Sequence, residues 1–206
     1  MDWDRYAQYI AERASGYWKR FESFGVDLRG KRVLDLGAGP GAFSQRLVEG
    51  GSRLTIWYDK SRHYALRFRS AAARGRPACG QVIGDMGVLP FAQGAFDLVY
   101  CRASLHYARS QGATLDEIRR VLGRGGHLYV EFDNFRRVHR DYPRLSWKRL
   151  GHHVFGFVSS LLGLHLRPPA FQVAWLVRLR MIGSGLVPVA TTVDGDLVAV
   201  LARKAG

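Results

Sequence analysis

A short apolar run that leads directly into three alternating glycines, residues 33–41, constrains this sequence more than any other feature. A helix-like stretch, residues 42–48, follows at once. Glycine at such a turn adopts backbone angles closed to other residues, and it lacks the Cβ that would keep a ligand at a distance. The amides that open the helix are left as free hydrogen-bond donors. The pattern therefore predicts a strand, a ligand-binding loop and a helix in direct succession.

Asp35 sharpens this prediction, because it lies near the end of a buried strand, where a purely structural residue would be Val or Ile. Three further segments, residues 54–59, 81–85 and 96–107, repeat the order of an apolar strand followed by a polar or acidic end. Strands separated by helical patterns form a parallel sheet through right-handed crossovers, with helices on both faces.

These segments resemble the class I S-adenosylmethionine-dependent methyltransferases, and most closely the small-molecule branch, which is methyltransferase type 11-like. Sequences of that branch read VLDLGCGTG, then an acidic residue, then GDAxxLPFxxxxFDxVxxxxxLHH. Here residues 33–41 read VLDLGAGPG, residues 84–91 read GDMGVLPF and residues 96–99 read FDLV. The resemblance covers residues 30–132 closely and the C-terminal end more loosely. The motifs in this order are far more specific than any one of them.

The resemblance implies an α/β fold with a Rossmann-like, doubly wound sheet of seven strands, mostly parallel, that ends in an antiparallel hairpin. The hairpin is also predicted from the residues themselves, because residues 186–193 and 197–202 are strand-like and Asp194-Gly195 joins them. A dehydrogenase Rossmann sheet lacks such a hairpin. At 206 residues we expect a single domain, 1–206, with a core that needs no disulfides.

The resemblance also implies that S-adenosylmethionine is the cofactor. Asp35 should orient the glycine loop near the cofactor's amino end, and Asp59 should accept hydrogen bonds from both ribose hydroxyls. Asp85 should accept one from the adenine amino group, with Met86 beside the ring. The full set of predicted cofactor-binding residues is Asp35, Gly37, Ala38, Gly39, Gly41, Asp59, Lys60, Asp85, Met86 and Cys101.

Two segments are predicted to flank this core. Residues 1–29 carry apolar side chains at three- and four-residue intervals, which indicates an amphipathic helix. In the family the equivalent region often covers the cofactor, which would bring Tyr17 or Trp18 to the ligand. Residues 134–167 form a long connection that mixes arginines with aromatic residues, and we expect it to be a helical lid over the substrate.

Two helix starts are predicted from capping residues. Ser61 is placed to cap a helix that runs to about residue 74. Thr114 and Glu117 form a capping-box pattern ahead of a second helix. Three glycines near residue 125 should end that helix, and residues 127–132 should form the next strand.

Methyl transfer is an in-line displacement at a carbon on a positively charged sulfur, so the protein mainly aligns the reactants. If the acceptor carries a proton, a base assists. His106 is the candidate catalytic residue because it follows the fourth strand at the mouth of the predicted site, and a packing role is its alternative. His152 and His153 have a spacing that suits no shared helix face, so we predict no metal site.

The composition bounds the partners and the compartment. Lys and Arg number 31 against 17 Asp and Glu, a net charge of +14, which indicates nucleic acid, an anionic membrane surface, an acidic partner or simply a basic solvated surface. Two cysteines are too few for a disulfide framework, and no N-terminal apolar run indicates a signal peptide. We therefore expect a cytoplasmic protein.

The preferred prediction is methyl transfer to a small, apolar or anionic metabolite, with peripheral contact to an anionic membrane left open. An RNA methyltransferase or a basic RNA-binding module is the first alternative, although motifs typical of cytosine and adenine methyltransferases are absent from the sequence. An NAD-dependent oxidoreductase is the second, because the loop fits the loose G-x-G-x-x-G/A pattern. A binding protein that retains the cofactor without turnover is the third.

Overall fold

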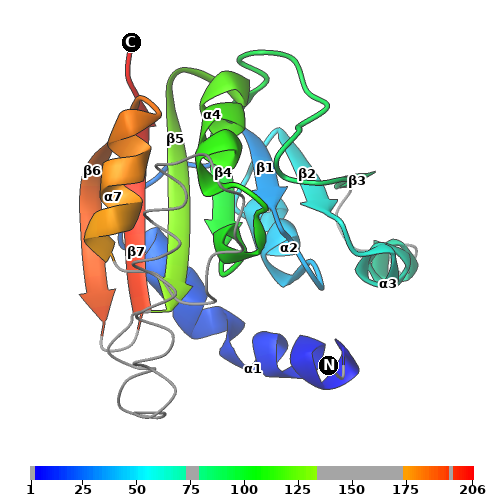
Figure 1. Cartoon of the computed structure of the whole chain (residues 1–206). Coiled ribbons are helices and arrows are strands. Elements are labelled where there is room, and N and C mark those ends of the chain that lie inside the picture. Colours follow the sequence, from blue (N-terminus) through cyan, green and yellow to red (C-terminus); the bar gives the residue numbers. More distant parts are fainter. Residues whose placement is uncertain (1–2, 73–78, 134–173, 195–196) are drawn as a thin grey trace.

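The computed structural model describes residues 3–72, 79–133, 174–194 and 197–206. Seven strands form one sheet in the order β3-β2-β1-β4-β5-β7-β6 (Figure 1). The strands are β1 Arg32–Leu36, β2 Leu54–Asp59, β3 Gly80–Ile83, β4 Phe96–Arg102, β5 Leu122–Asp133, β6 Leu186–Asp194 and β7 Leu197–Lys204. The helices are α1 Trp3–Glu22, α2 Ala42–Glu49, α3 Arg62–Ala72, α4 Gln111–Val121 and α7 Ala174–Gly183, with a 3-10 turn at Leu105–Tyr107.

The first five strands run parallel, and β7 lies antiparallel between β5 and β6. This arrangement confirms the predicted doubly wound sheet with its terminal hairpin. Asp194 pairs with Leu197, so Asp194 is the last residue of β6 and not the first residue of the turn. The two-residue connection is therefore 195–196, which lies outside the described residues. β5 begins at Leu122, five residues before the predicted start.

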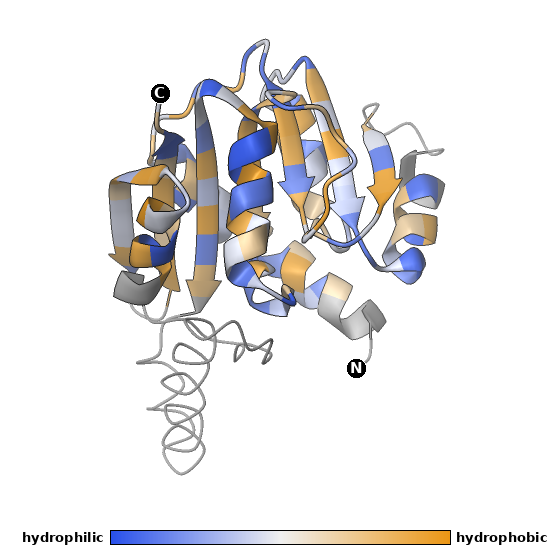
Figure 2. Cartoon of the chain, turned by 45° about the horizontal axis from the view of Figure 1, so that its top comes forward, coloured by the Kyte–Doolittle hydropathy of each residue, from blue (hydrophilic) through white to orange (hydrophobic). Residues whose placement is uncertain are grey.

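Helices cover both faces of the sheet because each strand alternates its side chains between them. Val33 packs with residues of α1 and α2, whereas its neighbour Leu34 packs with residues of α4 and α7. Figure 2 shows the same division on α4, which is hydrophilic along its outer side and hydrophobic where it meets the sheet. The two apolar clusters hold the ends of the parallel strands in fixed relative positions.

The start of α4 differs from the prediction. The helix begins at Gln111, and the Ser110 hydroxyl accepts a hydrogen bond from the Ala113 amide at 3.3 Å. Thr114 is fully buried inside the helix. The Glu117 carboxylate accepts from the Leu89 amide at 2.7 Å instead of returning to its own helix start. Among the described residues the Thr114 hydroxyl has no hydrogen-bond partner and Glu117 bonds to Leu89, so neither residue caps the helix, and Ser110 caps it one turn earlier.

The predicted helix cap at Ser61 and the predicted lid have different outcomes. The Ser61 hydroxyl accepts a hydrogen bond from the Tyr64 amide at 3.3 Å, which confirms it as the cap of α3. The proposed lid, 134–167, lies outside the described residues and stays a prediction. Along the described parts of the chain, no helix combines the length and the apolar character needed to cross a bilayer.

Candidate functional site

A cavity of about 350 Å³ opens at the carboxyl ends of β1, β2 and β4. Ligands of open α/β sheets bind at this edge, where loops leave neighbouring strands in opposite directions. The cavity brings together eight of the ten predicted cofactor-binding residues. They are Asp35, Gly37, Ala38, Gly39, Asp59, Lys60, Asp85 and Met86.

The glycine loop is tied to the end of β2 by three kinds of hydrogen bond. The Gly39 amide donates to Asp59 Oδ2 at 2.9 Å, and the Gly39 carbonyl accepts from the buried Trp57 indole at 3.0 Å. The Gly37 amide donates to the Tyr58 carbonyl at 2.8 Å. These contacts fix the loop before any ligand arrives, because each one uses a backbone group of the loop itself.

Asp59 has acceptor capacity left for a ligand. Its Oδ1 accepts from the Ser61 amide at 2.8 Å, and its Oδ2 accepts from Gly39. A carboxylate offers about four lone-pair positions. The side chain lines the cavity, so its remaining positions suit a pair of hydroxyl donors.

Asp35 is a buried carboxyl, and its side chain reaches the start of α2. The Ser44 hydroxyl donates to its Oδ2 at 2.5 Å. Burial raises the pKa of Asp35 to about 7, and the Ser44 hydrogen bond offsets only part of that increase. The group therefore gains or loses a proton near neutral pH, and a cation in the cavity would favour its charged form.

Asp85 and Met86 form the far wall of the cavity. Asp85 Oδ1 accepts from the Gly87 amide at 2.9 Å, and the Asp85 carbonyl accepts from the Tyr58 hydroxyl at 2.9 Å. A Cβ at Gly84 would lie 2.2 Å from that hydroxyl oxygen. The residue before Asp85 must therefore be small, because Tyr58 occupies the space of any side chain.

The glycines of the loop are required by the protein's own packing as well as by the approach of a ligand. A Cβ at Gly37 would lie 2.3 Å from Ser104 Cβ. One at Gly41 would lie 2.2 Å from the Phe68 ring. Gly41 also has a φ of 82° at the start of α2, and it does not line the cavity. The Phe68 ring fills the space beside Gly41, so the structure explains this glycine by packing, and its contact with the cofactor stays a prediction.

Cys101 also lies away from the cavity. Its side chain is fully buried in the cluster under α4, where the sulfur lies 3.2 Å from Ser104 Oγ. Burial raises the pKa of the thiol to about 12. Neighbouring residues of a strand face opposite sides of the sheet, so Arg102 and not Cys101 reaches the cavity.

The structure does not bring His106 to the cavity. The 3-10 turn directs its ring inward, where it is 9% exposed and its centroid lies 4.2 Å from that of Tyr107. Burial lowers its pKa to about 4, which makes the imidazole a weak base at neutral pH. Its neighbours Ser104 and Tyr107 line the cavity instead. This geometry favours the packing role for His106.

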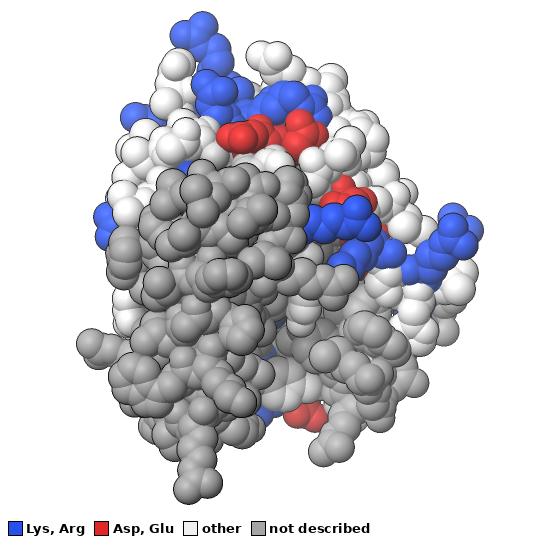
Figure 3. Space-filling model, in the orientation of Figure 1, with Lys and Arg blue, Asp and Glu red and all other residues white. Residues whose placement is uncertain are grey.

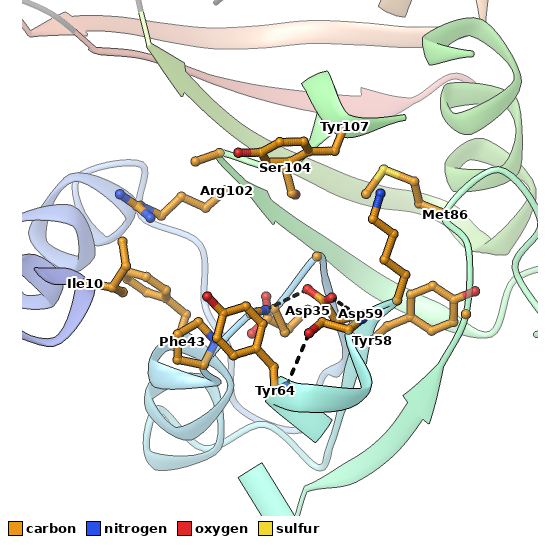
Figure 4. Close-up of a pocket in the computed structure, with 18 of the residues that line it drawn as sticks. Ile10, Asp35, Phe43, Tyr58, Asp59, Tyr64, Met86, Arg102, Ser104 and Tyr107 are labelled. Carbon is orange, nitrogen blue, oxygen red and sulfur yellow. Dashed lines mark hydrogen bonds between the residues drawn. The ribbon is translucent and has the colours of Figure 1, made fainter. Parts of the chain in front are cut away.

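The cavity is also lined by residues that were not predicted from the sequence, among them Ile10, Tyr64, Arg102, Ser104 and Tyr107. Figure 4 shows Asp35, Asp59 and Tyr64 on one side of the cavity, Ser104 and Tyr107 opposite them, and Arg102 and Met86 toward its two ends. Helix α1 contributes Ile10, whereas Tyr17 and Trp18 do not line the cavity. Tyr17 instead stacks on Arg102, with the guanidinium carbon 3.5 Å from the ring centroid. A basic residue at the end of an apolar strand was the available signal for Arg102.

Charged side chains lie both near the cavity and at the other edge of the sheet. In the view of Figure 3, Lys and Arg side chains gather at the top, near the amino ends of the parallel strands, and again at the middle right, with Asp and Glu beside both groups. Lys60 and Arg102 line the cavity, and Arg109 Nε lies 3.9 Å from Asp85 Oδ2, so basic side chains also lie at the carboxyl ends of the strands. Within the described ranges, no three His, Cys, Asp or Glu side chains gather to hold a metal ion.

A family model described as a methyltransferase domain matches residues 34–130. A solved S-adenosylmethionine-dependent methyltransferase of Aquifex aeolicus superposes with a TM-score of 0.71 at 15% identity, over 91% of this chain and 89% of that one. At that identity the structural likeness concerns the fold alone.

Three curated relatives are similar over 55–62% of this chain. A malonyl-[acyl-carrier protein] O-methyltransferase of Legionella pneumophila is 32% identical over 62% of this chain and 44% of its own length. A demethylmenaquinone methyltransferase of Beutenbergia cavernae is 35% identical over 55% and 45%. A tRNA U34 carboxymethyltransferase of Pseudomonas aeruginosa is 31% identical over 58% and 37%. The chain spans less than half the length of each relative.

Proposed function

Because the chain belongs to the class I S-adenosylmethionine-dependent methyltransferases, we propose that it transfers the methyl group of this cofactor to a small, apolar or anionic metabolite. One observation carries the proposal: the glycine loop, Asp59 and Asp85 surround a single cavity. Its volume, about 350 Å³, falls within the range of roughly 300–1,000 Å³ that is typical of small-ligand sites.

The residues of the cavity fit the cofactor's chemistry. Asp59 has lone pairs left for the ribose hydroxyls, and Asp85 offers a carboxylate for the adenine amino group. Asp35 places a third carboxyl beside the loop, where a positive charge would favour its ionised form. A ligand that carries a sulfonium, an ammonium and two hydroxyls matches three carboxyls better than a dinucleotide with its two phosphates does.

The cofactor supplies the activated methyl group, and the chain's own residues align the reactants. The loop is held by Asp59 and Trp57, so the ligand-facing backbone needs little rearrangement on binding. Ser104 and Tyr107 line the cavity opposite Asp35 and Asp59 (Figure 4), and we place the acceptor on that side. His106 lies away from this side, which favours transfer by alignment without this histidine as base.

The acceptor is proposed from charge and from the relatives. The cavity is lined by the carboxyl groups of Asp35, Asp59 and Asp85 as well as by Lys60 and Arg102, and these carboxyl groups disfavour a phosphate backbone inside the site. Two relatives are named for an acyl-carrier-bound malonyl group and for demethylmenaquinone, and a third for tRNA. A small metabolite agrees with the first two names.

Labelled methyl transfer tests this function. We expect label from S-adenosylmethionine to enter an organic extract of metabolites and not RNA when both are supplied to the protein. Asp59→Ala is the control, because loss of hydrogen bonds to a charged group should weaken cofactor binding by about 1.5–3 kcal/mol. Label at one defined position in RNA would overturn the choice of acceptor. Tight binding of a nicotinamide dinucleotide, with none of S-adenosylmethionine, would overturn the cofactor.

The ionisation of Asp35 predicts a pH dependence of cofactor binding. The pKa of Asp35 is raised to about 7, so its carboxyl is mostly neutral at pH 6 and mostly charged at pH 7.5. A cationic cofactor binds the charged form better, and we expect its affinity to rise roughly five- to tenfold across this interval. Calorimetry with wild type and Asp35→Asn at both values measures it. An equal rise in the Asn variant would assign the effect to the ligand's own amino group.

A further inference from the structure

We infer that Arg102 recognises a carboxylate at the end of the cavity nearest helix α1. The inference rests on the proposed function, and it assigns to this arginine a specificity that none of the predicted cofactor contacts supplies. Arg102 is the last residue of β4, and it lines the cavity with Ile10 and Phe43 nearby (Figure 4).

Arg102 is a buried cation with unused donors. Its side chain is 8% exposed, and its Nε donates to Glu131 Oε1 at 2.9 Å. A guanidinium has five N–H donors. Among the described residues, the two terminal nitrogens of Arg102 have no hydrogen-bond acceptor. Arg102 lines the cavity, so its terminal nitrogens can donate to a ligand that accepts hydrogen bonds from both of them.

The charge around Arg102 also favours an anion. Glu131 is 1% exposed, and its Oε2 accepts from Arg20 Nη1 at 3.1 Å and from the Tyr129 hydroxyl at 2.9 Å. One buried carboxylate therefore serves two guanidinium groups. The second terminal nitrogen of Arg20 pairs with Asp194, whose side chain is 75% exposed and screened by solvent. Within this cluster two guanidinium groups therefore face one buried carboxylate, while Asp35 and Asp59 add negative charge elsewhere on the cavity wall.

The orientation of the guanidinium suits a planar anion. The Tyr17 ring of α1 lies 3.5 Å from its central carbon, and the Phe43 ring of α2 lies 5.0 Å away. The rings and Glu131 together restrict the side chain, so its terminal nitrogens form a fixed fork that binds a carboxylate through two parallel bonds. A phosphate dianion would meet the nearby carboxyls of Asp35 and Asp59 and is disfavoured by them.

Two molecules could supply this carboxylate: the amino-acid part of the cofactor or an acidic acceptor. The first arm of the test compares S-adenosylhomocysteine with its decarboxylated analogue, 5′-(3-aminopropylthio)-5′-deoxyadenosine, by calorimetry. The second arm compares octanoate with octanamide on protein saturated with S-adenosylhomocysteine. Wild type should prefer the carboxylate over its neutral counterpart by about 10- to 100-fold in one arm.

Arg102→Met should reduce that preference to less than threefold while the neutral ligand keeps its affinity. Arg32→Met is the matched control, because it also removes an arginine from a carboxylate, Asp97 at 2.8 Å, but at the opposite end of β1. It should keep the wild-type preference. If Arg102→Met fails to fold, the comparison of ligands on wild type and the Arg102→Lys variant, which retains charge without the fork, still decides the question.

The possible outcomes distinguish a failure of the Arg102 inference from a failure of the proposed function. Binding of S-adenosylhomocysteine with no preference for a carboxylate in either arm would overturn the role of Arg102 and leave the proposed function standing. An equal loss of preference in Arg32→Met would also overturn it, since the effect would then be global. No binding of S-adenosylhomocysteine by wild type would overturn the proposed function, and the carboxylate site with it.

Discussion

Glu131→Ala should lower the free energy of unfolding by about 3–5 kcal/mol, the usual cost of leaving a buried ion pair without one partner. The change leaves Arg20 and Arg102, which are 12% and 8% exposed, without the carboxylate that both contact. It also removes the acceptor of the Tyr129 hydroxyl. Denaturant unfolding followed by circular dichroism measures the loss.

Glu131→Gln should lose less than the Ala variant, because an amide oxygen still accepts one of these hydrogen bonds. Glu12→Ala is the control, since Glu12 pairs with Arg13 at 3.7 Å on the exposed side of α1 and contributes little there. A Glu131→Ala protein as stable as wild type would show that solvent reaches the two arginines, and burial of the cluster would then be wrong.

Gly37→Ala should destabilise the protein by about 2–5 kcal/mol, from strain at positive φ together with crowding. The new Cβ would lie 2.3 Å from Ser104 Cβ, at a residue whose φ is 72°. Ser104 cannot move freely, because its hydroxyl donates to the Leu36 carbonyl at 2.9 Å. Cofactor affinity should fall as well, since the loop shifts away from Asp59. Thermal unfolding and calorimetry report the two effects.

Gly125→Ala separates strain from crowding. Gly125 has a φ of 69°, and a Cβ there would meet no atom within 4 Å, so it carries the strain alone. Ser104→Gly combined with Gly37→Ala should recover the crowding part, at the expense of the Ser104 hydrogen bond. Equal losses in Gly37→Ala and Gly125→Ala would mean that the contact with Ser104 is not tight.

The sheet and most of the cavity could be predicted because they depend on local patterns. Apolar strands that end in Asp35, Asp59 and Asp85 bring these residues to one edge whenever the strands are parallel. The hairpin is marked by two strand-like runs with a glycine between them. The pairing of Asp194 with Leu197 places the turn one residue later than predicted, and the sequence does not reveal this pairing.

Predictions that depended on register or on distant packing succeeded less well. Tyr100 pairs with Asp35, which turns Cys101 to the opposite face and Arg102 to the cavity. That register depends on how β4 aligns with β1, and the order of residues does not reveal it. The contact of Gly41 with Phe68 likewise needs α3 in place. The ion pairs of Glu131 with Arg102 and Arg20 join the ends of β4 and β5 to α1. No short sequence pattern predicts them.

The position of β7 sets an order of events during synthesis. β7 pairs with β5 along seven residues, and residues 134–196 separate the two strands in the chain. At a synthesis rate of roughly 5–20 residues per second, β5 waits several seconds with one hydrogen-bonding edge open. Leu128 and Val130, both fully buried in the finished sheet, lie along that edge. The interval before β7 arrives is therefore when a nascent chain is most exposed to pairing with another copy, and a chaperone that covers β5 then would protect its yield.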